Sequence, residues 1–309
     1  MSYVIGIDGG GTKTKAVLAD EHGTIYSEIV AGPSNLNSTS RDSVEKTFQD
    51  IFSHFKKTQP EIFRHVEFCF AGLSGIENEQ NDAFTTAVFE QIIGGQFPYL
   101  IENDAVNALY SGTYGEPGIV QIAGTGSITF GIDRQLNKKR VGGWGYLFGD
   151  QGSGYAIGRD ALQVVFQRYD RNEPESLLIE QLKDHFKVTG DLKEIVPLIY
   201  KVKSPRNVIA NLSEVVFNAY DSGDKDAENI IRKAVKDLSD SIQTIASQFS
   251  SLKPQVVLVG GLFTRSDVLL PLLDEALKGE FPLILPKVEP VMGSVVAALR
   301  EIGVRFSID

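Results

Sequence analysis

The sequence predicts an α/β protein made of two related lobes. Strands alternate with helices in both halves of the chain, a pattern typical of α/β architecture. A strand, small-residue turn and strand at 5–18 return in the same layout at 119–132. The length of 309 residues allows roughly two domains at about 150 residues each. We therefore expect a first lobe at 1–115, joined by a C-terminal helix at about 292–309, and a second lobe at 116–291.

The first half begins with a predicted three-stranded meander. Apolar runs between glycine-rich turns predict its strands at Tyr3–Ile7, Lys15–Ala19 and Thr24–Val30. Apolar residues at helical spacing predict a helix over Ser43–Phe55, with Ser43 as its N-cap. Two further strands are expected, each followed by helical spacing, at Val66–Ala71 and Tyr99–Glu102.

The second half repeats the pattern and then becomes mostly helical. Strands are predicted at Ile119–Ala123 and Ile128–Ile132, and helices over much of 156–250. The clearest helix is 229–249, because its apolar residues recur every three or four positions and form one buried stripe. The last predicted elements are a strand at Pro254–Val259, a helix around Leu269–Leu273, a strand at Pro282–Pro286 and a helix at Met292–Ile302.

Composition excludes several classes of function. The net charge of −10 disfavours binding to nucleic-acid backbones. Cys69 is the only cysteine, so the chain holds neither an intramolecular disulfide nor a four-thiolate metal centre. No stretch approaches the ~20 apolar residues of a membrane span, and no signal peptide is visible. We expect a cytoplasmic protein without a membrane or nucleic-acid partner.

The first chemical motif is the glycine-rich turn after the first strand, Asp8-Gly-Gly-Gly-Thr-Lys-Thr14. Glycines let backbone N–H groups approach an anion closely, and threonine hydroxyls add donors. Asp8 ends an apolar strand, where its carboxylate could face a metal ion held by phosphates. A type I′ hairpin with glycines at positive φ is the alternative. Three glycines with an aspartate and two threonines exceed what a hairpin needs, which favours phosphate binding.

Two further small-residue segments fit the same chemistry. In isolation, a plain hairpin explains the turn Gly124-Thr-Gly-Ser127 better than a phosphate loop does. Together with the first motif, the turn could form the second side of a phosphate clamp. The segment Gly260-Gly261 follows an apolar strand and would allow a flat ring to lie on bare backbone. Close packing of a helix on a strand is its alternative explanation.

Three segments suggest a site for a polyhydroxylated substrate. Asp104, in Glu-Asn-Asp-Ala, could act as a general base on a hydroxyl or simply cap a helix. The stretch 142–154 combines many glycines with Trp144 and Asp150, which suits sugar binding better than an irregular loop around a buried tryptophan. Asn35, in Pro-Ser-Asn-Leu-Asn, could bind hydroxyl or amide groups, or only form a turn.

The order of these motifs resembles the N-acetylglucosamine kinase family. The motifs are DGGGTKT, END, GTGS, GGWGYLFGDQGSG and VLVGG, and they span nearly the whole chain. That family is grouped with the BadF/BcrA-type ATPases in the actin, heat-shock ATPase and hexokinase superfamily. The resemblance implies two ribonuclease-H-like lobes around an ATP cleft. It also implies ATP and Mg²⁺ as cofactors, a homodimer, and a role in amino-sugar metabolism and the recycling of cell-wall sugars.

The resemblance also implies roles for individual residues. Asp8 would serve the metal, and Asp104 would take the proton of the sugar 6-hydroxyl. The implied ATP-binding residues are Gly10, Gly11, Thr12, Lys13, Thr125, Gly126, Asn211, Gly260 and Gly261. The implied sugar-binding residues are Asn35, Ser74, Asp104, Gly143, Trp144, Gly145 and Asp150.

Several alternatives remain open at this point. A kinase that also accepts N-acetylmuramic acid, or a glucosamine kinase, has the same motif set. A dehydratase activator is disfavoured because its iron–sulfur cluster needs more cysteines, and the ROK branch because its zinc motif is missing. Two alternatives of another class are a non-catalytic sugar sensor and an ATPase that drives a partner protein. The presence of Asp8, Asp104 and Asp150 argues against the sensor, which needs no base.

Overall fold

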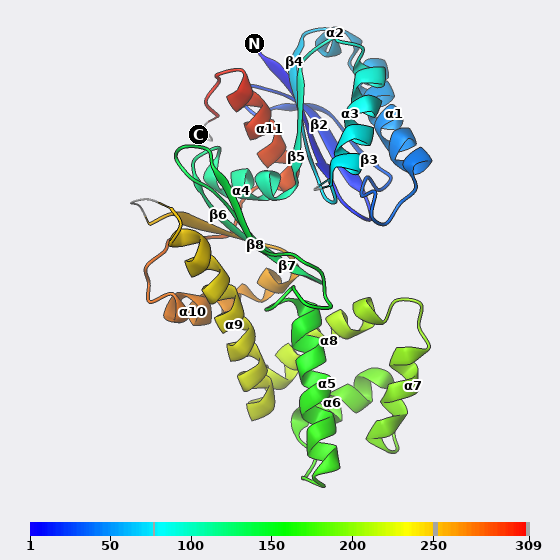
Figure 1. Ribbon diagram of the computed structural model, residues 1–309, viewed down its shortest axis with the longest axis vertical. Coiled ribbons are helices and arrows are strands. Elements are labelled where there is room, and N and C mark those ends of the chain that lie inside the picture. The colour runs from blue at the N-terminus through cyan, green and yellow to red at the C-terminus, as the bar shows by residue number, and fades with distance from the viewer. Residues whose placement is uncertain (77, 250–252, 307–309) are drawn as a thin grey trace. The chain divides into compact units, whose positions relative to one another are not determined.

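The computed structural model describes residues 1–76, 78–249 and 253–306 and confirms the predicted α/β class. The chain divides into two compact units, Met1–Gly118 with Ile284–Asp309, and Ile119–Leu283. Each unit is built on one five-stranded sheet (Figure 1). Residues 116–118 and 284–291, which we expected in the second lobe, belong to the first unit.

The first unit has strand order β3-β2-β1-β4-β5. Strands β1 to β3 form the antiparallel meander, whereas β4 and β5 run parallel to β1. The strands are β1 (Tyr3–Gly9), β2 (Thr14–Asp20), β3 (Ile25–Ala31), β4 (Val66–Leu73) and β5 (Tyr99–Asn103). The helices are α1 (Arg41–Thr58), α2 (Pro60–Phe63), α3 (Glu79–Ile93), α4 (Ala105–Thr113) and α11 (Pro290–Glu301).

Alternating side chains of the central strand β1 explain how this sheet is covered. Ile5 and Ile7 are buried in a core that includes Phe48 of α1 and Phe89 of α3. Gly6 points to the other face, where its missing side chain lets α11 approach closely at Ser294 and Val295. Helices α1 and α3 therefore cover one face, and α4 and α11 the other (Figure 1).

The start of α1 differs from the prediction. Ser40 is the N-cap, and its hydroxyl accepts a hydrogen bond from the backbone N–H of Ser43, which lies inside the first turn. The prediction of Ser43 as the cap was wrong because it took the first apolar residue, Val44, as the start of the helix. The polar residues Arg41 and Asp42 form the first turn instead.

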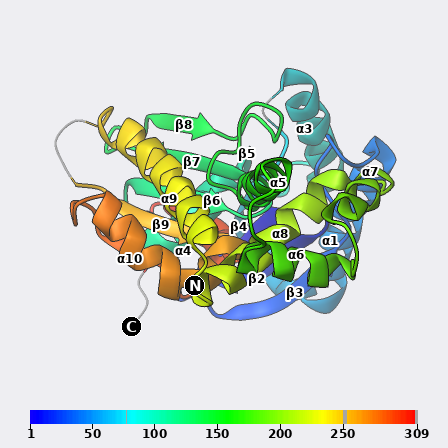
Figure 2. The same cartoon turned by 90° about the horizontal axis from the view of Figure 1, so that it is seen from below.

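The second unit has strand order β10-β9-β6-β7-β8. Its strands are β6 (Gly118–Ala123), β7 (Ser127–Ile132), β8 (Lys138–Gly142), β9 (Gln255–Val259) and β10 (Leu283–Ile284). Its helices are α5 (Gly154–Asp170), α6 (Leu177–Phe186), α7 (Ile195–Tyr200), α8 (Pro205–Asp221), α9 (Lys225–Ala246) and α10 (Ser266–Ala276), with 3₁₀ turns η1 (Leu192–Glu194) and η2 (Gly261–Arg265). Helix α9 packs against β7 and β8 (Figure 2).

The two sheets share one topology. Written from the other edge, the second sheet is β8-β7-β6-β9-β10, the same succession as β3-β2-β1-β4-β5. In both units a strand hairpin is followed by a third neighbouring strand, a helical segment and two more strands. The repeat noticed between 5–18 and 119–132 thus extends over both sheets. No helix within the described ranges is both long and apolar enough to cross a membrane.

Candidate functional site

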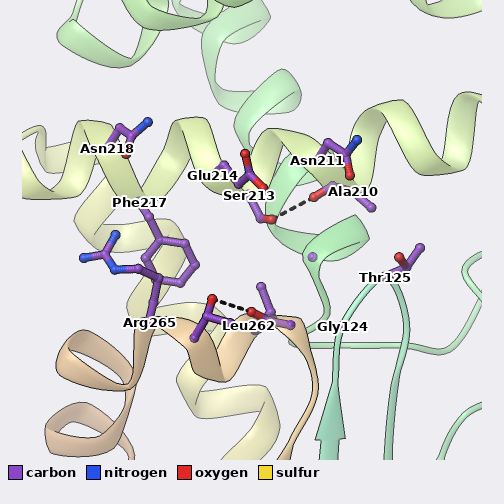
Figure 3. A pocket seen from close by; sticks show the side chains of 13 residues that line it. Gly124, Thr125, Ala210, Asn211, Ser213, Glu214, Phe217, Asn218, Leu262 and Arg265 are labelled. Atoms are coloured by element: carbon purple, nitrogen blue, oxygen red, sulfur yellow. Dashed lines mark hydrogen bonds between the residues drawn. The ribbon is translucent and has the colours of Figure 1, made fainter.

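A cavity of about 450 Å³ lies within the second unit (Figure 3). Three segments line it: the turn between β6 and β7, helix α8, and the 3₁₀ turn η2. Thr125 and Gly261 come from two separate motifs, and Asn211 was implied by the resemblance alone. All three, which we assigned to ATP, line this cavity. Gly126 and Gly260 belong to the same segments but are not among the lining residues.

Helix α8 presents its polar face to the cavity. Asn211, Glu214 and Asn218 recur every three or four residues, are exposed, and line the cavity. The residues between them pack into the core of the unit, with Leu212 fully buried. Phe217 and Leu262 add apolar surface from α8 and η2. A cavity with an apolar wall and a few polar groups is typical of a site for a flat heterocycle.

The two glycines after β9 have different structural reasons. A Cβ on Gly260 would lie 2.3 Å from the carbonyl oxygen of Ala123, and the residue has φ of +114°. Gly260 therefore permits close packing of β9 against β6. A Cβ on Gly261 meets nothing within 4 Å, because this residue borders the cavity. The close packing at Gly260 is between two strands, not between a helix and a strand as the alternative explanation had it. The ring-binding role of Gly261 stays a prediction.

The β6–β7 turn is held by the first residues of α5. Gly154 donates its backbone N–H to the carbonyl of Gly124 at 2.7 Å, and Tyr155 donates to Thr125 at 3.3 Å. These bonds fix the turn so that Thr125 borders the cavity (Figure 3).

In the first unit, the glycine-rich turn joins β1 to β2. Gly10 donates its N–H to the carbonyl of Lys13 at 3.0 Å, and residues 11–13 are exposed. Gly9, Gly10 and Gly11 all lie outside the positive-φ region, so the type I′ hairpin considered as the alternative does not form. A Cβ on Gly9 would lie 2.3 Å from the Ser34 hydroxyl, so this glycine serves close packing.

Asp8 lies at the end of β1 and is held by a buried asparagine. Asn107 of α4 donates its side-chain N–H to Asp8 Oδ1 at 2.8 Å and to the carbonyl of Gly72 at 3.1 Å. Burial raises the pKa of Asp8, the Asn107 bond and Lys13 lower it, and Glu289 raises it. A carboxylate whose charge is destabilised by burial is stabilised by a nearby cation.

The predicted sugar residues Asn35 and Ser74 contact one another. Asn35 Nδ2 donates to the Ser74 hydroxyl at 3.0 Å, and Asn35 Oδ1 accepts from the backbone N–H of Asn37 at 2.8 Å. Ser74 also donates its backbone N–H to the carbonyl of Gly9 at 2.9 Å. These bonds join the predicted sugar loop to the end of the strand that carries Asp8.

Asp104 follows β5 at the same edge of the first sheet. Gly9, Leu73 and Asn103 are register partners at the ends of β1, β4 and β5. The residues that directly follow these three strand ends are therefore Gly10 after β1, Ser74 after β4 and Asp104 after β5. Asp104 is the N-cap residue of α4, as the capping alternative had it, but its side chain makes no capping hydrogen bond. Asn103 Oδ1 accepts the N–H of Ala105 instead, at 2.9 Å.

The glycine-rich segment of the second unit exposes its aromatic residues. Trp144 is 62% exposed, and the Arg140 guanidinium lies 4.0 Å from its ring centroid. The alternative of a buried tryptophan is therefore wrong, since most of the Trp144 side chain remains exposed beside Arg140. Gly143 and Gly145 have φ of +70° and +91°, values that favour glycine.

Asp150 lies near the end of this segment and is buried. It has φ of +58°, and only 4% of its surface is exposed. Its Oδ2 lies 3.4 Å from Arg206 Nη2, at the start of α8. Burial raises the pKa of Asp150, and the Arg206 charge counteracts part of this rise.

Two residues of these sites were not predicted from the sequence. Asn107 lies three residues after Asp104, a spacing that places both on one side of a helix and could have drawn attention to it. Arg206 carries no local signal, because its partner Asp150 is distant in the sequence. Within the described residues, no group of three or more His, Cys, Asp or Glu side chains gathers as a metal site.

Comparisons with known proteins identify the family of the chain. The model of the BadF/BadG/BcrA/BcrD ATPase family matches residues 5–298. An N-acetylmuramic acid/N-acetylglucosamine kinase of Clostridium acetobutylicum is 29% identical over 97% of this chain and 99% of its own length. An N-acetyl-D-glucosamine kinase of Dictyostelium discoideum is 30% identical over 96% of this chain and 97% of its own.

The fold has a counterpart among solved structures. A candidate N-acetylglucosamine kinase from Chromobacterium violaceum superposes with a TM-score of 0.68 and 25% identity, covering 96% of this chain and 98% of that one. The family model spans nearly the whole chain, and the Dictyostelium relative reaches 30% identity. The chain therefore belongs to the BadF/BadG/BcrA/BcrD ATPase family.

Proposed function

We propose that this protein is an ATP-dependent kinase that phosphorylates the 6-hydroxyl of an amino sugar, with N-acetylglucosamine as the first candidate. The observation that carries the proposal is the cavity of the second unit, which is lined by Thr125, Asn211 and Gly261 from three separate segments of the chain. The activities of the Clostridium and Dictyostelium relatives support the amino-sugar substrate. The Clostridium relative also makes N-acetylmuramic acid a second candidate, and glucosamine is a third.

The cavity would take the nucleoside of ATP. The base would lie against Gly261 and Leu262, where no side chain of Gly261 intervenes. Asn211 supplies amide donors and acceptors from α8. Thr125 and Gly126 in the second unit, and Gly10, Gly11, Thr12 and Lys13 in the first, would bind phosphates through backbone N–H groups, hydroxyls and one ammonium group. Gly260 would contribute by packing rather than by contact, since its neighbour is the Ala123 backbone.

Asp8 fits a role as the protein ligand of Mg²⁺. Magnesium prefers oxygen ligands and is commonly held by one or two carboxylates together with substrate phosphates and water. Asn107 binds Asp8 Oδ1, so Oδ2 is the oxygen available to a cation. When bound, Mg²⁺ would neutralise part of the phosphate charge during phosphoryl transfer.

The sugar-binding residues of the first unit would be Asn35, Ser74 and Asp104. The Asn35–Ser74 bond fixes the two side chains relative to one another, which suits recognition of hydroxyl or N-acetyl groups. Gly143, Trp144, Gly145 and Asp150 would contribute from the second unit. Asp104 would accept the proton of the sugar 6-hydroxyl. The resulting oxygen would attack the γ-phosphorus, and the bond from that phosphorus to the β–γ bridging oxygen would break to release ADP.

Replacing Asp104 tests this mechanism. We expect Asp104→Asn to fold and bind ATP, and to lose on the order of 10²–10⁴-fold in turnover, because the amide cannot take a proton. Steady-state rates of ADP formation with N-acetylglucosamine measure this loss. Glu90→Gln removes an exposed negative charge from the same unit and serves as the matched control. Turnover of Asp104→Asn close to that of the control would exclude Asp104 as the base.

We also propose a cytoplasmic homodimer that acts in amino-sugar metabolism and the recycling of cell-wall sugars. Cys69 is a buried free thiol, which is compatible with a reducing compartment. The homodimer rests on the family resemblance, and light scattering coupled to size-exclusion chromatography measures it directly.

A further inference from the structure

Arg206 lies beside the second phosphate loop of the proposed kinase, and no motif of the sequence included it. Its Nη2 atom lies 3.1 Å from the position that a Cβ on Gly126 would occupy. Asp150 Oδ2 lies 2.8 Å from the same position. The guanidinium and the carboxylate therefore lie directly against the glycine that follows Thr125. A side chain at position 126 would force the ends of these two side chains to shift.

The Asp150–Arg206 ion pair is asymmetric in its exposure to solvent, and the Arg206 guanidinium also lies 5.4 Å from the Tyr146 ring centroid. The Asp150 side chain is 5% exposed, whereas that of Arg206 is 39% exposed. Their closest approach is 3.4 Å, longer than the 2.7–2.9 Å typical of a strong charge-assisted hydrogen bond. A guanidinium has five N–H donors, and among the described residues Asp150 is the one carboxylate within ion-pair distance. Donors therefore remain for a ligand.

The position of Arg206 on α8 fits a phosphate rather than a base. The lining residues Asn218, Phe217, Glu214 and Asn211 follow α8 toward its N-terminus, in the direction of Thr125 (Figure 3). Arg206 lies about 8 Å further along the helix axis, at 1.5 Å per residue, in its first turn. A nucleotide with its base at Phe217 and Gly261 would thus direct its phosphates toward Arg206. The positive end of the helix dipole favours the same orientation.

We infer that Arg206 binds a phosphate group of the nucleotide, and that Asp150 positions its guanidinium beside the β6–β7 turn. The inference rests on the proposed function, because it requires a nucleotide in the cavity of the second unit. It assigns Asp150 a second role, as the anchor of Arg206, besides the sugar contact that the resemblance implies. A chain with net charge −10 gains from a cation at this point, since ATP is itself strongly anionic.

Calorimetric binding of ATP, ADP and adenosine tests the role of Arg206. We expect Arg206→Gln to weaken ATP binding roughly tenfold or more, since a hydrogen-bonded charge is lost. Adenosine, which has no phosphate, should bind within about twofold of its wild-type affinity. Arg206→Lys keeps the positive charge but not the planar guanidinium, so it should lose less ATP affinity than Arg206→Gln does. Lys203→Gln, an exposed cation just before α8, is the matched control and should bind ATP as the wild type does.

Removing Arg206 leaves the buried Asp150 carboxylate without its cation, so a second variant is included. Asp150→Asn combined with Arg206→Gln leaves no unpaired buried charge and should show the same selective loss of ATP affinity. An equal loss for ATP and adenosine would overturn the inference, since it would indicate general damage to the cavity. Unchanged ATP affinity of Arg206→Gln together with a raised KM for the sugar would also overturn the inference. A wild-type protein that binds none of the three ligands would overturn the nucleotide site itself.

Discussion

At the residue scale, neighbouring glycines in the site serve different purposes. Gly260 is required by the Ala123 carbonyl and by its own positive φ, whereas Gly261 faces open space at the cavity. The sequence showed two identical residues after a strand, and it left binding and packing as equal alternatives. The two alternatives can be told apart only once β6 is seen to lie beside β9 in the sheet.

Alanine at each glycine should separate the two roles. We expect Gly260→Ala to lower the free energy of unfolding by about 1–3 kcal/mol or more, because its Cβ would overlap a backbone oxygen. Gly261→Ala should change this free energy by less than about 0.5 kcal/mol, and should weaken ATP binding because its methyl group enters the cavity. Urea unfolding and calorimetry measure the two quantities. Equal stability of the two variants would contradict this assignment.

The Asp150–Arg206 pair gives a pH-dependent prediction. Burial holds the pKa of Asp150 above its ordinary value, and removing the Arg206 charge should raise it further. Because this pKa is higher in the folded than in the unfolded state, the ionised carboxylate destabilises the fold above that pKa. Protonation removes the penalty as the pH falls through it.

Arg206→Gln should therefore be less stable than the wild type by about 1–2 kcal/mol at neutral pH, a modest value because Arg206 is partly in water. The difference should shrink as the pH falls through the pKa of Asp150. Urea unfolding of both proteins at several pH values measures it. A difference in stability between the two proteins that grows as the pH falls would contradict this prediction.

At the element scale, two helix crossings depend on glycine. A Cβ on Gly158 of α5 would lie 1.8 Å from the carbonyl oxygen of Ile209 in α8. A Cβ on Gly293 of α11 would lie 1.9 Å from the carbonyl oxygen of Asn107 in α4. The first crossing positions the helix that lines the cavity, and the second positions the helix that carries Asn107. In each unit, a close contact between two helices thus positions a helix that carries candidate site residues.

Gly158→Ala should lower both stability and ATP affinity. The methyl group must displace α8, which we expect to cost about 1–3 kcal/mol or more and to disturb the lining residues. Gln163→Ala, at an exposed position of the same helix, should change stability by no more than about 0.5 kcal/mol. Urea unfolding and ATP calorimetry provide the readouts. Wild-type values for Gly158→Ala would show that the two helices need no such close approach.

Most helices and strands could be predicted because their signals are local. The apolar stripe of α9 and the glycine turns of the two hairpins are visible in short windows of sequence. The start of α1 was misplaced because Ser40 and Ser43 are both good caps, and polar residues form the first turn. Asn107 and Arg206 were missed because their partners, Asp8 and Asp150, are brought to them only by the fold.

At the scale of the whole molecule, one topology is used twice. The first sheet carries Asp8, Ser74 and Asp104 at or beyond the ends of neighbouring strands, and the second carries the cavity beside β6 and β9. Comparing 5–18 with 119–132 revealed only the two hairpins. The shared order of all the strands required the structure, because later strands of the repeat are separated by helical segments of different length.

Sugar-dependent formation of ADP from Mg-ATP tests the central claim most directly. The panel is N-acetylglucosamine, N-acetylmuramic acid, glucosamine, N-acetylmannosamine and glucose. We predict rapid ADP formation with one or two amino sugars, N-acetylglucosamine among them, and little without sugar. ADP formation at the same rate without any sugar would contradict the kinase and favour an ATPase that drives a partner. Sugar binding without any ADP formation would contradict it equally and favour a sensor.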